Sequence, residues 1–515
     1  MTNVGEHDTG NASESTPLLR ESRDNNIRDV PDQSVSPETL HVAHRRRKWR
    51  VVLLLYIYVF FMMLGDSLYP AAMIQVLEDI ICENYYATPS GIVALRQLLD
   101  PDNRCKAYAV QKELALVRGV QQLVPVFAGV LCTVPYSLLA ERIGRKPVLI
   151  LSGAGTAFAF AWVLAVGYFR FVPVRWIWLS GAFLFIGGGD PVLSSVAHVM
   201  ITDATELSER AQIFLCLHAA NVGSGFFGPA ISAALMENGH VWTVLLLAVA
   251  SVFFGAFVIT SFIPETLHLR QSDTASRSPV AQDGDSAAEE SVESAKFHGS
   301  LLAPLRSMLT SNPQALLLIC IFAPQTAARE LFNSIGLQYS NDKFDLPYSR
   351  GNVLLSLFQG AQGLFALVLL PFITRVIAEP RGWSAWARDR LYAVVSIGAM
   401  TFGLLVIALA PVLSIEVVGL LLVSLGNCSN GLLMSLMGGA VRSDEVSAIY
   451  SAALMLSIIV QSGTGPIFNS LLVAGLNLGW KWLGLPFVVM AGLMAFEFGA
   501  SLFIRTERDR SVHDE

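Results

Sequence analysis

Long apolar stretches separated by short polar connections run along most of the chain. Twelve of them are long enough to cross a membrane, since about 20 apolar residues span ~30 Å of hydrocarbon. Each should form an α-helix, because a backbone exposed to lipid must satisfy its own hydrogen bonds. The pattern therefore predicts an all-α membrane protein with twelve transmembrane helices, at 51–77, 113–139, 147–169, 176–202, 211–236, 241–263, 314–338, 352–374, 391–411, 414–440, 447–474 and 483–504.

The longest polar interruption lies between the sixth and seventh stretches and divides the helices into two sets of six. Ser, Ala, Asp and Glu dominate residues 271–296, as is typical of a flexible linker. We expect five regions: a disordered cytoplasmic tail (1–48), a six-helix bundle (49–263), a cytoplasmic linker (264–312), a second six-helix bundle (313–505) and a cytoplasmic tail (506–515).

The two halves repeat one another. When the sequence is shifted by 237 residues, Gly228-Pro229 falls on Gly465-Pro466 and Asp190 falls on Asn427. No gap is needed from the fourth span through the fifth. Two pseudo-symmetric bundles around one site allow a membrane protein to open that site to alternate sides by rocking. The repeat therefore favours a transporter.

Composition and charge fit this organisation. Hydrophobic residues make up 53% of the chain, charged residues make up 15%, and the mean hydropathy is +0.52. Soluble domains carry about 25% charged residues on average. Lys and Arg gather on one side of the membrane when the N-terminus is placed in the cytoplasm, as the positive-inside rule requires. Both termini are then cytoplasmic. We expect a multi-pass plasma-membrane protein, with the vacuolar membrane as the alternative.

The loop between the second and third spans carries a recognisable motif. Ser137–Lys146, Ser-Leu-Leu-Ala-Glu-Arg-Ile-Gly-Arg-Lys, resembles the major facilitator superfamily signature Gly-x-x-x-Asp-Arg-x-Gly-Arg-Lys, with Ser for Gly and Glu141 for Asp. The resemblance covers about 49–505 and implies the two-bundle transporter fold. It also implies a cytoplasmic conformational latch formed by Glu141 and Arg145, with Asp203 at the end of span four as the partner. Alternatively, the basic loop only sets the topology.

Other motifs concern the direction of transport. Ser224–Ala233 in span five, Ser-Gly-Phe-Phe-Gly-Pro-Ala-Ile-Ser-Ala, is similar to the superfamily's antiporter signature, and Gly463–Pro466 in span eleven shows that a symmetric scaffold would give the same pattern. Ser15–Leu19, Glu78–Tyr86 and Gln111–Ala115 resemble a fungal branch of the superfamily. That resemblance implies an efflux pump for drugs or secondary metabolites.

Charged residues inside spans mark function, because placing them in the membrane costs free energy. We place Asp66 in span one, Arg118 in span two, Asp190 in span four, and Arg329 and Glu330 in span seven. By resemblance, spans one, four, seven and ten line the central cavity, so the three carboxyl groups would face it. Asp190 lies near mid-span and is the candidate for coupling transport to protons.

These residues also have structural interpretations. Asp66 and Arg118 both lie in the outer halves of their spans and could neutralise each other. Arg329 and Glu330 are sequence neighbours and point to different faces of a helix, so at most one faces the cavity squarely.

Polar residues in the later spans leave the same choice. Asn427 and Asn430 in span ten are candidates for substrate contact, although hydrogen bonding between helices explains such stripes equally well. Glu497 lies on peripheral span twelve, and we interpret it as structural.

Cys82 and Cys105 flank the predicted outer loop, in an oxidising compartment, and we expect a disulfide between them. The four other cysteines lie within spans and suit apolar packing. The sequence shows no phosphate-binding loop, metal-ligand spacing or catalytic triad pattern, so we expect neither an enzyme nor a cofactor.

The leading functional hypothesis is a proton-driven exporter of a small apolar or amphipathic organic compound, acting as a monomer in the lipid bilayer without nucleic acid. A proton-coupled uptake symporter for an organic anion is the alternative, with Arg118 or Arg329 binding the anion. A transporter-like receptor that moves nothing is an alternative of another class. The intramembrane carboxyl groups favour transport, because a receptor needs no proton path.

Overall fold

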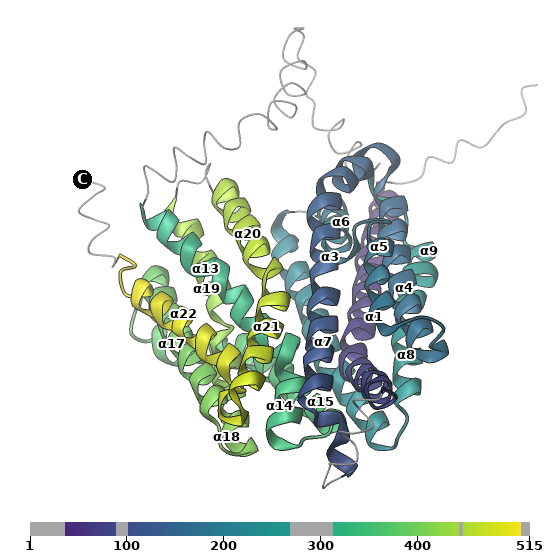
Figure 1. The fold of residues 1–515 in the computed structure, drawn as a ribbon. Coiled ribbons are helices and arrows are strands. Elements are labelled where there is room, and N and C mark those ends of the chain that lie inside the picture. Colours follow the sequence, from purple (N-terminus) through teal and green to yellow (C-terminus); the bar gives the residue numbers. More distant parts are fainter. Residues whose placement is uncertain (1–36, 89–100, 206, 268–312, 442–445, 506–515) are drawn as a thin grey trace, which may run out of the picture. The chain divides into compact units, whose positions relative to one another are not determined.

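The structure is a computed structural model that describes residues 37–88, 101–205, 207–267, 313–441 and 446–505 (Figure 1). From Lys48 onward these residues belong to one unit. Every regular element within the described ranges is a helix. The predicted all-α fold is confirmed.

The N-terminal half contains six spans in chain order. Several of them are made of consecutive shorter helical segments, including the π-helical η3. The segments are α1 (Pro37–Tyr86), η1 (Pro101–Lys106), α3 (Tyr108–Ile143), α4 (Arg145–Phe169), η2 (Val174–Leu179), α5 (Ser180–Leu184), α6 (Gly189–Ala204), α7 (Leu207–Glu237), α8 (Val241–Phe253), η3 (Phe254–Ile259) and α9 (Thr260–Phe262).

The C-terminal half repeats this order of spans. Its segments η4, η5 and η6 are π-helical continuations of the spans that contain them. The segments are α13 (Pro313–Leu331), η4 (Phe332–Gly336), α14 (Leu337–Phe344), α15 (Tyr348–Leu364), η5 (Phe365–Leu369), α16 (Leu370–Ile373), η6 (Thr374–Ala378), α17 (Ala385–Leu409), α18 (Leu413–Gly426), α19 (Ser429–Ala440), α20 (Val446–Ser462), α21 (Thr464–Leu478), η7 (Trp480–Trp482) and α22 (Leu485–Ser501).

The predicted number of spans is confirmed. Eleven helical segments among the described residues are long and apolar enough to cross a membrane. α7, with 31 residues, provides the fifth span in sequence order and completes the twelve. The glycine motif predicted between spans two and three ends α3 and precedes α4, because Gly144 adopts a φ of +108° that other residues rarely reach.

Two boundaries differ from the prediction. Span one was expected to end at residue 77, but α1 continues to Tyr86, and α3 begins at Tyr108 rather than at residue 113. Hydropathy ends these spans early because the added turns contain polar residues. Those residues bond to one another instead of to water: Gln111 Nε2 donates to the buried carboxyl of Glu78 over 2.7 Å.

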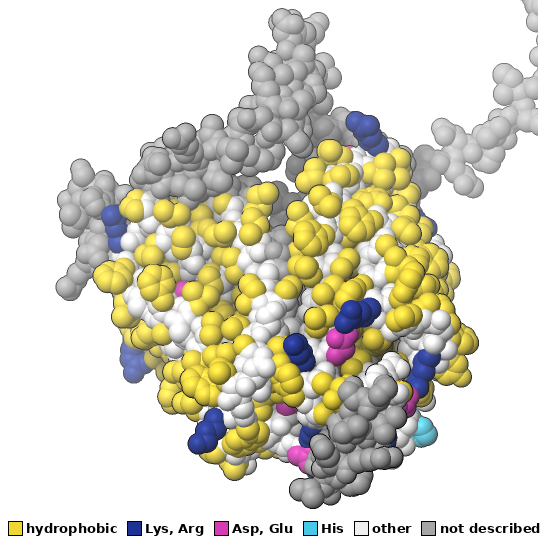
Figure 2. Space-filling model, viewed as in Figure 1, with side chains coloured by type: hydrophobic (Ala, Val, Ile, Leu, Met, Phe, Trp, Pro, Cys, Tyr) yellow, Lys and Arg dark blue, Asp and Glu magenta, His cyan; other side chains and the backbone are white. Residues whose placement is uncertain are grey.

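The surface of the helical bundle is largely apolar. Figure 2 shows hydrophobic side chains spread over the visible face, with a few charged groups among them, mostly in its lower half. Large side chains such as Phe496, at 75% exposure, and Leu409, at 74%, would be costly in water but suit lipid. The exposure of these residues places the membrane around the bundle.

Hydrogen bonds across the interface between the halves follow the internal repeat. Asn352 Nδ2 in α15 donates to Ser232 Oγ in α7 over 2.7 Å. Asn469 Nδ2 in α21 donates to Gln122 Oε1 in α3 over 3.1 Å. Ser232 and Asn469 are 237 residues apart, so the same position of each half bonds to the other half.

The two ends of the bundle differ in how the halves are joined. The disulfide end carries Cys82 and Cys105, and the linker end carries the start of α4, the end of α9 and the start of α13. In Figure 1, α14 lies at the disulfide end below, and the start of α13 lies at the linker end above. Where both partners lie in the described ranges, hydrogen bonds between the halves fall in the membrane half nearest the disulfide.

Candidate transport site

A cavity of about 460 Å³ lies between the two halves, in the middle of the bundle. Helices of both halves line it: α1, α3, α4, α5, α6 and α7 from the first half, and α13, η4 and α15 from the second. Four of the predicted site residues line this cavity: Asp66, Arg118, Asp190 and Glu330. The structure thus brings together side chains that are up to 264 residues apart in the sequence.

The other predicted cavity residues lie elsewhere. Arg329 precedes Glu330 but is not among the residues that line the cavity. Asn427 and Asn430, at the junction of α18 and α19, do not line it either. Their side-chain oxygens are buried without a hydrogen-bond partner in the described part of the chain.

The carboxyl groups meet in the cavity. The side chains of Asp66 and Asp190 are accessible although they lie deep between helices, so their access is to the cavity. Asp66 is close enough to Asp190 and Glu330 for their charges to interact. Glu330 also accepts a hydrogen bond from Asn333 Nδ2 over 3.5 Å. Three acids in one cavity provide sites that can take up or release protons.

Arg118 bridges the two halves at the disulfide end of the cavity. Its side chain is 6% exposed, and its Nη2 donates to Ser334 O in η4 over 2.7 Å. Its Nη1 is buried with no hydrogen-bond partner among the described residues. The described ion pairs do not include one between Arg118 and Asp66. The structure therefore does not pair these two residues, and Arg118 bonds to the opposite half instead.

Span four, predicted as one helix over 176–202, is broken in its middle. α5 ends at Leu184 and α6 begins at Gly189. Between them Gly187 and Gly188 adopt φ values of +97° and +81°, and Gly189 follows at +62°. Glycine alone adopts such angles at little cost, which is why three glycines in a row end one helix and start the next. Asp190 consequently stands in the first turn of α6.

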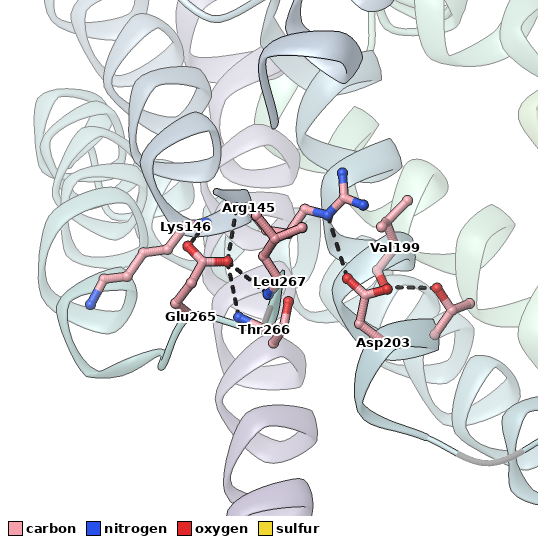
Figure 3. Close-up of polar contacts among 8 residues, drawn as sticks. Arg145, Lys146, Val199, Asp203, Glu265, Thr266 and Leu267 are labelled. Carbon is pink, nitrogen blue, oxygen red and sulfur yellow. Dashed lines mark hydrogen bonds and ion pairs between the residues drawn. The ribbon is translucent and has the colours of Figure 1, made fainter. Parts of the chain in front are cut away.

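At the linker end, Arg145 and Asp203 form the pair expected for the latch (Figure 3). Arg145 Nε lies 3.4 Å from Asp203 Oδ2, and both side chains are buried, at 4% and 5% exposure. Glu141 is exposed and takes no part in this pair. The geometry joins the start of α4 to the end of α6.

Glu265, just after span six, binds the backbone of the first turn of α4. Its carboxylate accepts the backbone N–H groups of Arg145 and Lys146 over 2.9 Å and 3.0 Å, and also those of Thr266 and Leu267 (Figure 3). Burial alone would raise the pKa of Glu265, but the four N–H donors lower it below its usual value. Glu265 therefore remains a carboxylate that neutralises the N-terminal end of α4.

Cys82 and Cys105 form a disulfide with their Cα atoms 5.2 Å apart. The disulfide attaches η1 to the end of α1, and η1 places Lys106 against the C-terminal half. Lys106 Nζ donates to Asn341 O over 3.2 Å and pairs with Asp345. Partial burial lowers the pKa of Lys106, although Asp342 and Glu78 favour its charged form. The disulfide thus holds η1 in place, so that Lys106 joins the two halves at the disulfide end of the bundle.

Several polar residues outside the predicted site make defined contacts. Glu416 in α18 is fully buried and accepts the hydroxyl of Ser340 over 2.7 Å. Gln338 Nε2 donates to Gln111 Oε1 over 2.9 Å and so joins the two halves. Glu265 lies just after the predicted end of span six at residue 263. Gln338 and Glu416 lie at the ends of predicted spans and Glu265 lies just outside one, and hydropathy alone does not reveal the partner of such a polar residue.

A twelve-helix bundle with a central polar cavity between two repeated halves has the architecture of a membrane transporter. The Major Facilitator Superfamily model matches residues 55–462, and the chain belongs to that superfamily. The protein is a transporter and not an enzyme.

Two curated relatives are fungal. The chain is 27% identical over 446 residues to the efflux pump atnC of Emericella nidulans, covering 86% of this chain and 85% of the relative. It is 24% identical over 517 residues to the efflux pump ustT of Aspergillus flavus, covering 96% of each. Among solved structures, the nucleoside transporter NupG is similar with a TM-score of 0.58 and 13% identity, over 88% of this chain and 99% of that one. At that identity the likeness concerns the fold.

Proposed function

We propose that the protein is a proton-driven exporter of a small apolar or amphipathic organic compound, such as a drug or secondary metabolite. One observation carries this proposal: carboxyl groups from both halves meet in a single central cavity. A carboxyl group that is exposed to alternate sides of the membrane can carry a proton in one direction while substrate leaves in the other.

The lining of the cavity supports the class of substrate. Polar groups such as Gln121 and Gln359 share the walls with apolar side chains such as Met73, Phe160 and Leu355. Pockets of roughly 300–1,000 Å³ with mixed lining suit drug-sized compounds. The efflux pumps among the relatives support export as the direction.

Within this proposal, Asp190 couples transport to protons, and Arg145 with Asp203 acts as the conformational latch. Glu141 is assigned no bond in the latch. The protein works as a monomer in the plasma membrane, with both termini in the cytoplasm. The linker end is then the cytoplasmic end, and the hydrogen bonds at the disulfide end keep the cavity closed to the outside. The described conformation is therefore inward-facing.

Transport in sealed vesicles tests the proposal. Purified protein is reconstituted into liposomes. In a separate sample, the share of protein that protease cleaves from outside gives the fraction of molecules with the linker end outward. Amphipathic fluorescent dyes, rhodamine 6G and Nile red among them, are added outside, and the lumen is made acidic. We expect accumulation of at least one dye that collapses with a protonophore.

Liposomes with the Asp190→Asn variant provide the matched control, since their lipid and orientation are the same. Accumulation that persists without a pH gradient, or that is equal in protein-free liposomes, would contradict a proton-driven exporter.

A second candidate, uptake of an organic anion together with protons, is favoured by one observation. The Nη1 group of Arg118 is buried beside the cavity without a hydrogen-bond partner in the described ranges, and a carboxylate of a substrate could pair with it. Transport in the same vesicles distinguishes a symporter from an exporter. A symporter would accumulate a fluorescent carboxylate when the acidic side is the side of addition, and an exporter would not.

A further inference from the structure

The break in span four is held by neighbouring helices on both sides. Tyr136 in α3 donates its hydroxyl to Phe185 O over 3.0 Å, at the end of α5. Ser152 in α4 donates its hydroxyl to Gly189 O over 2.8 Å, at the start of α6. Phe185 O also accepts the N–H of Gly187 over 3.0 Å, so the Tyr136 bond adds to a turn that is already formed. The Ser152 bond attaches the first residue of α6 to α4.

Ser152 occupies the tighter of the two positions. Its side chain is 0% exposed, and α4 touches the break directly there, because a Cβ atom on Gly187 would contact the backbone N of Ser152. Cβ atoms on Gly188 and Gly189 would meet other side chains, those of Val192 and Leu184. Among the hydrogen bonds of the described residues, the bond from Ser152 is the one by which a side chain of a neighbouring helix holds the start of α6.

The start of α6 determines where Asp190 lies. Asp190 directly follows Gly189, the residue whose carbonyl group Ser152 binds. Gly188, the N-cap residue, makes no side-chain cap bond, and Pro191 has no N–H, so the positive end of the helix remains near the Asp190 carboxyl group. A shift of this turn would move Asp190 relative to both the helix dipole and the cavity.

We propose that Ser152 is a positioning residue for Asp190: its hydroxyl fixes the first turn of α6 and thereby holds the Asp190 carboxyl group in the cavity. The proposal rests on the proton-coupling role given to Asp190 above. Ser152 itself does not line the cavity, so it acts through α6 and not by contact with substrate.

Other groups around Asp190 also affect its titration. Tyr58 and Asp66 face it from α1, Arg118 lies on α3, and Glu330 lies on α13. None of these residues bonds to Ser152 in the described structure, so removing the Ser152 hydroxyl changes the position of Asp190 and leaves their side chains in place.

Infrared spectroscopy of the protein in liposomes tests this without a substrate. Difference spectra recorded across a pH series contain the C=O stretch of protonated carboxyl groups, and the component absent from Asp190→Asn belongs to Asp190. In Ser152→Ala we expect its titration midpoint to move to higher pH by about half a unit, because one hydrogen bond no longer holds the carboxylate at the positive end of α6.

Ser424→Ala is the matched control. Ser424 is also 0% exposed and donates to a backbone carbonyl of a neighbouring span, Phe358 O over 3.0 Å, but it lies in the other half. In Ser424→Ala the titration midpoint of Asp190 should equal that of the wild type. If Ser152→Ala does not fold, Tyr136→Phe removes the bond on the other side of the break and should move the midpoint in the same direction.

The outcomes separate the two levels of the argument. An Asp190 band with the wild-type midpoint in Ser152→Ala and Tyr136→Phe overturns the positioning role and leaves proton coupling intact. The absence of any titrating band attributable to Asp190 overturns the coupling role and the positioning role together. An equal shift in Ser424→Ala would also overturn the proposal, because the effect would then not be specific to the break.

Discussion

Span four and span ten occupy corresponding places in the two halves but differ in backbone and chemistry. In span four, three glycines with positive φ separate α5 from α6, and Asp190 follows them. At the matching place in span ten, Asn427 and Cys428 keep right-handed helical angles, with φ near −63° and −62°. The N-terminal half thus has a break and an acid where the C-terminal half has a mild turn and an amide.

The starts of the third span in each half differ in the same way. The first turn of α4 is held by a residue 120 positions away, Glu265, and by the pair of Arg145 with Asp203. The first turn of α17 is capped locally, since Ser384 accepts the N–H of Ala387 over 3.2 Å, and its distant contact is between neutral groups, since Trp386 Nε1 donates to Arg505 O over 3.0 Å. We infer that the repeated scaffold provides the two-sided movement and that the N-terminal half carries most of the charged groups that control it.

The largest test of this comparison exchanges the two side chains at the matching positions. Asp190→Asn should abolish pH-driven accumulation, because an amide cannot carry the proton, while binding of the dye persists. Asn427→Asp should change transport far less, because Asn427 does not line the cavity. Accumulation in liposomes and dye binding by fluorescence polarisation measure the two effects.

The double variant Asp190→Asn, Asn427→Asp sharpens the test. It should remain inactive if the proton site depends on the broken span. Restored transport in the double variant would show that the two halves are interchangeable, and normal transport in Asp190→Asn alone would leave Asp190 only a structural hydrogen-bonding role.

The second prediction concerns the latch. Arg145→Ala removes a buried ion pair between α4 and α6, and the buried Asp203 carboxylate loses this cationic partner. We expect transport to slow by about tenfold, which corresponds to ~1.4 kcal/mol in the balance between conformations, while surface expression survives. Arg388→Ala is the control, since Arg388 pairs with its sequence neighbour Asp389 on α17. Equal rates in wild type and Arg145→Ala would leave this loop only its role in topology.

The difference between the halves also explains which features the sequence predicted. Spans follow from hydropathy alone, so their number and order could be predicted. The cavity residues Asp66, Asp190 and Glu330 could be predicted too, because charged residues in an apolar stretch are conspicuous. The pattern Ile-Gly-Gly-Gly-Asp at 186–190 contained the signal for the break, but glycines are common in tight helix packing and do not by themselves reveal a positive φ.

Contacts between distant residues could not be predicted. Arg118 was considered against Asp66 because both lie at similar depth, yet it bonds to Ser334 in the other half. The contacts of Glu265 could not be predicted, because its partners in α4 are backbone N–H groups, which leave no mark in the sequence. Such contacts depend on how the bundles pack, and that information is not contained in the periodicity of single spans.

The third prediction uses the low pKa of Glu265. A carboxyl group whose pKa is lower in the folded state stabilises that state above its unfolded pKa, about 4.3, and this stabilisation is lost as pH falls through the folded value. Glu265→Gln should therefore lower the melting temperature at pH 7 more than at pH 4. Thermal melting in detergent at the two pH values measures this, and an equal loss at both would mean that the charge of Glu265 contributes nothing.

The fourth prediction concerns the disulfide end. With Cys82 and Cys105 bridged, neither thiol should react with a membrane-impermeant maleimide on intact cells until a reductant is added. Labelling after reduction would also show that the disulfide end of the bundle faces the outside of the cell. The variant with serine at both positions should not label under either condition, and ready labelling of the wild type without a reductant would contradict the bridge.

The smallest effect is expected at Glu497. This carboxyl group is 3% exposed, and Gln325 Nε2 donates to it over 2.7 Å while Gln325 Oε1 accepts the hydroxyl of Ser429 over 3.0 Å. The chain of hydrogen bonds joins α22, α13 and α19 within the C-terminal half and does not reach the cavity. Glu497→Gln keeps an oxygen that can accept from Gln325, so the rate and pH profile of accumulation should stay within about twofold of the wild type. A pH profile altered as strongly as that of Asp190→Asn would place a second proton site in the C-terminal half, and the contrast between the halves would then no longer hold.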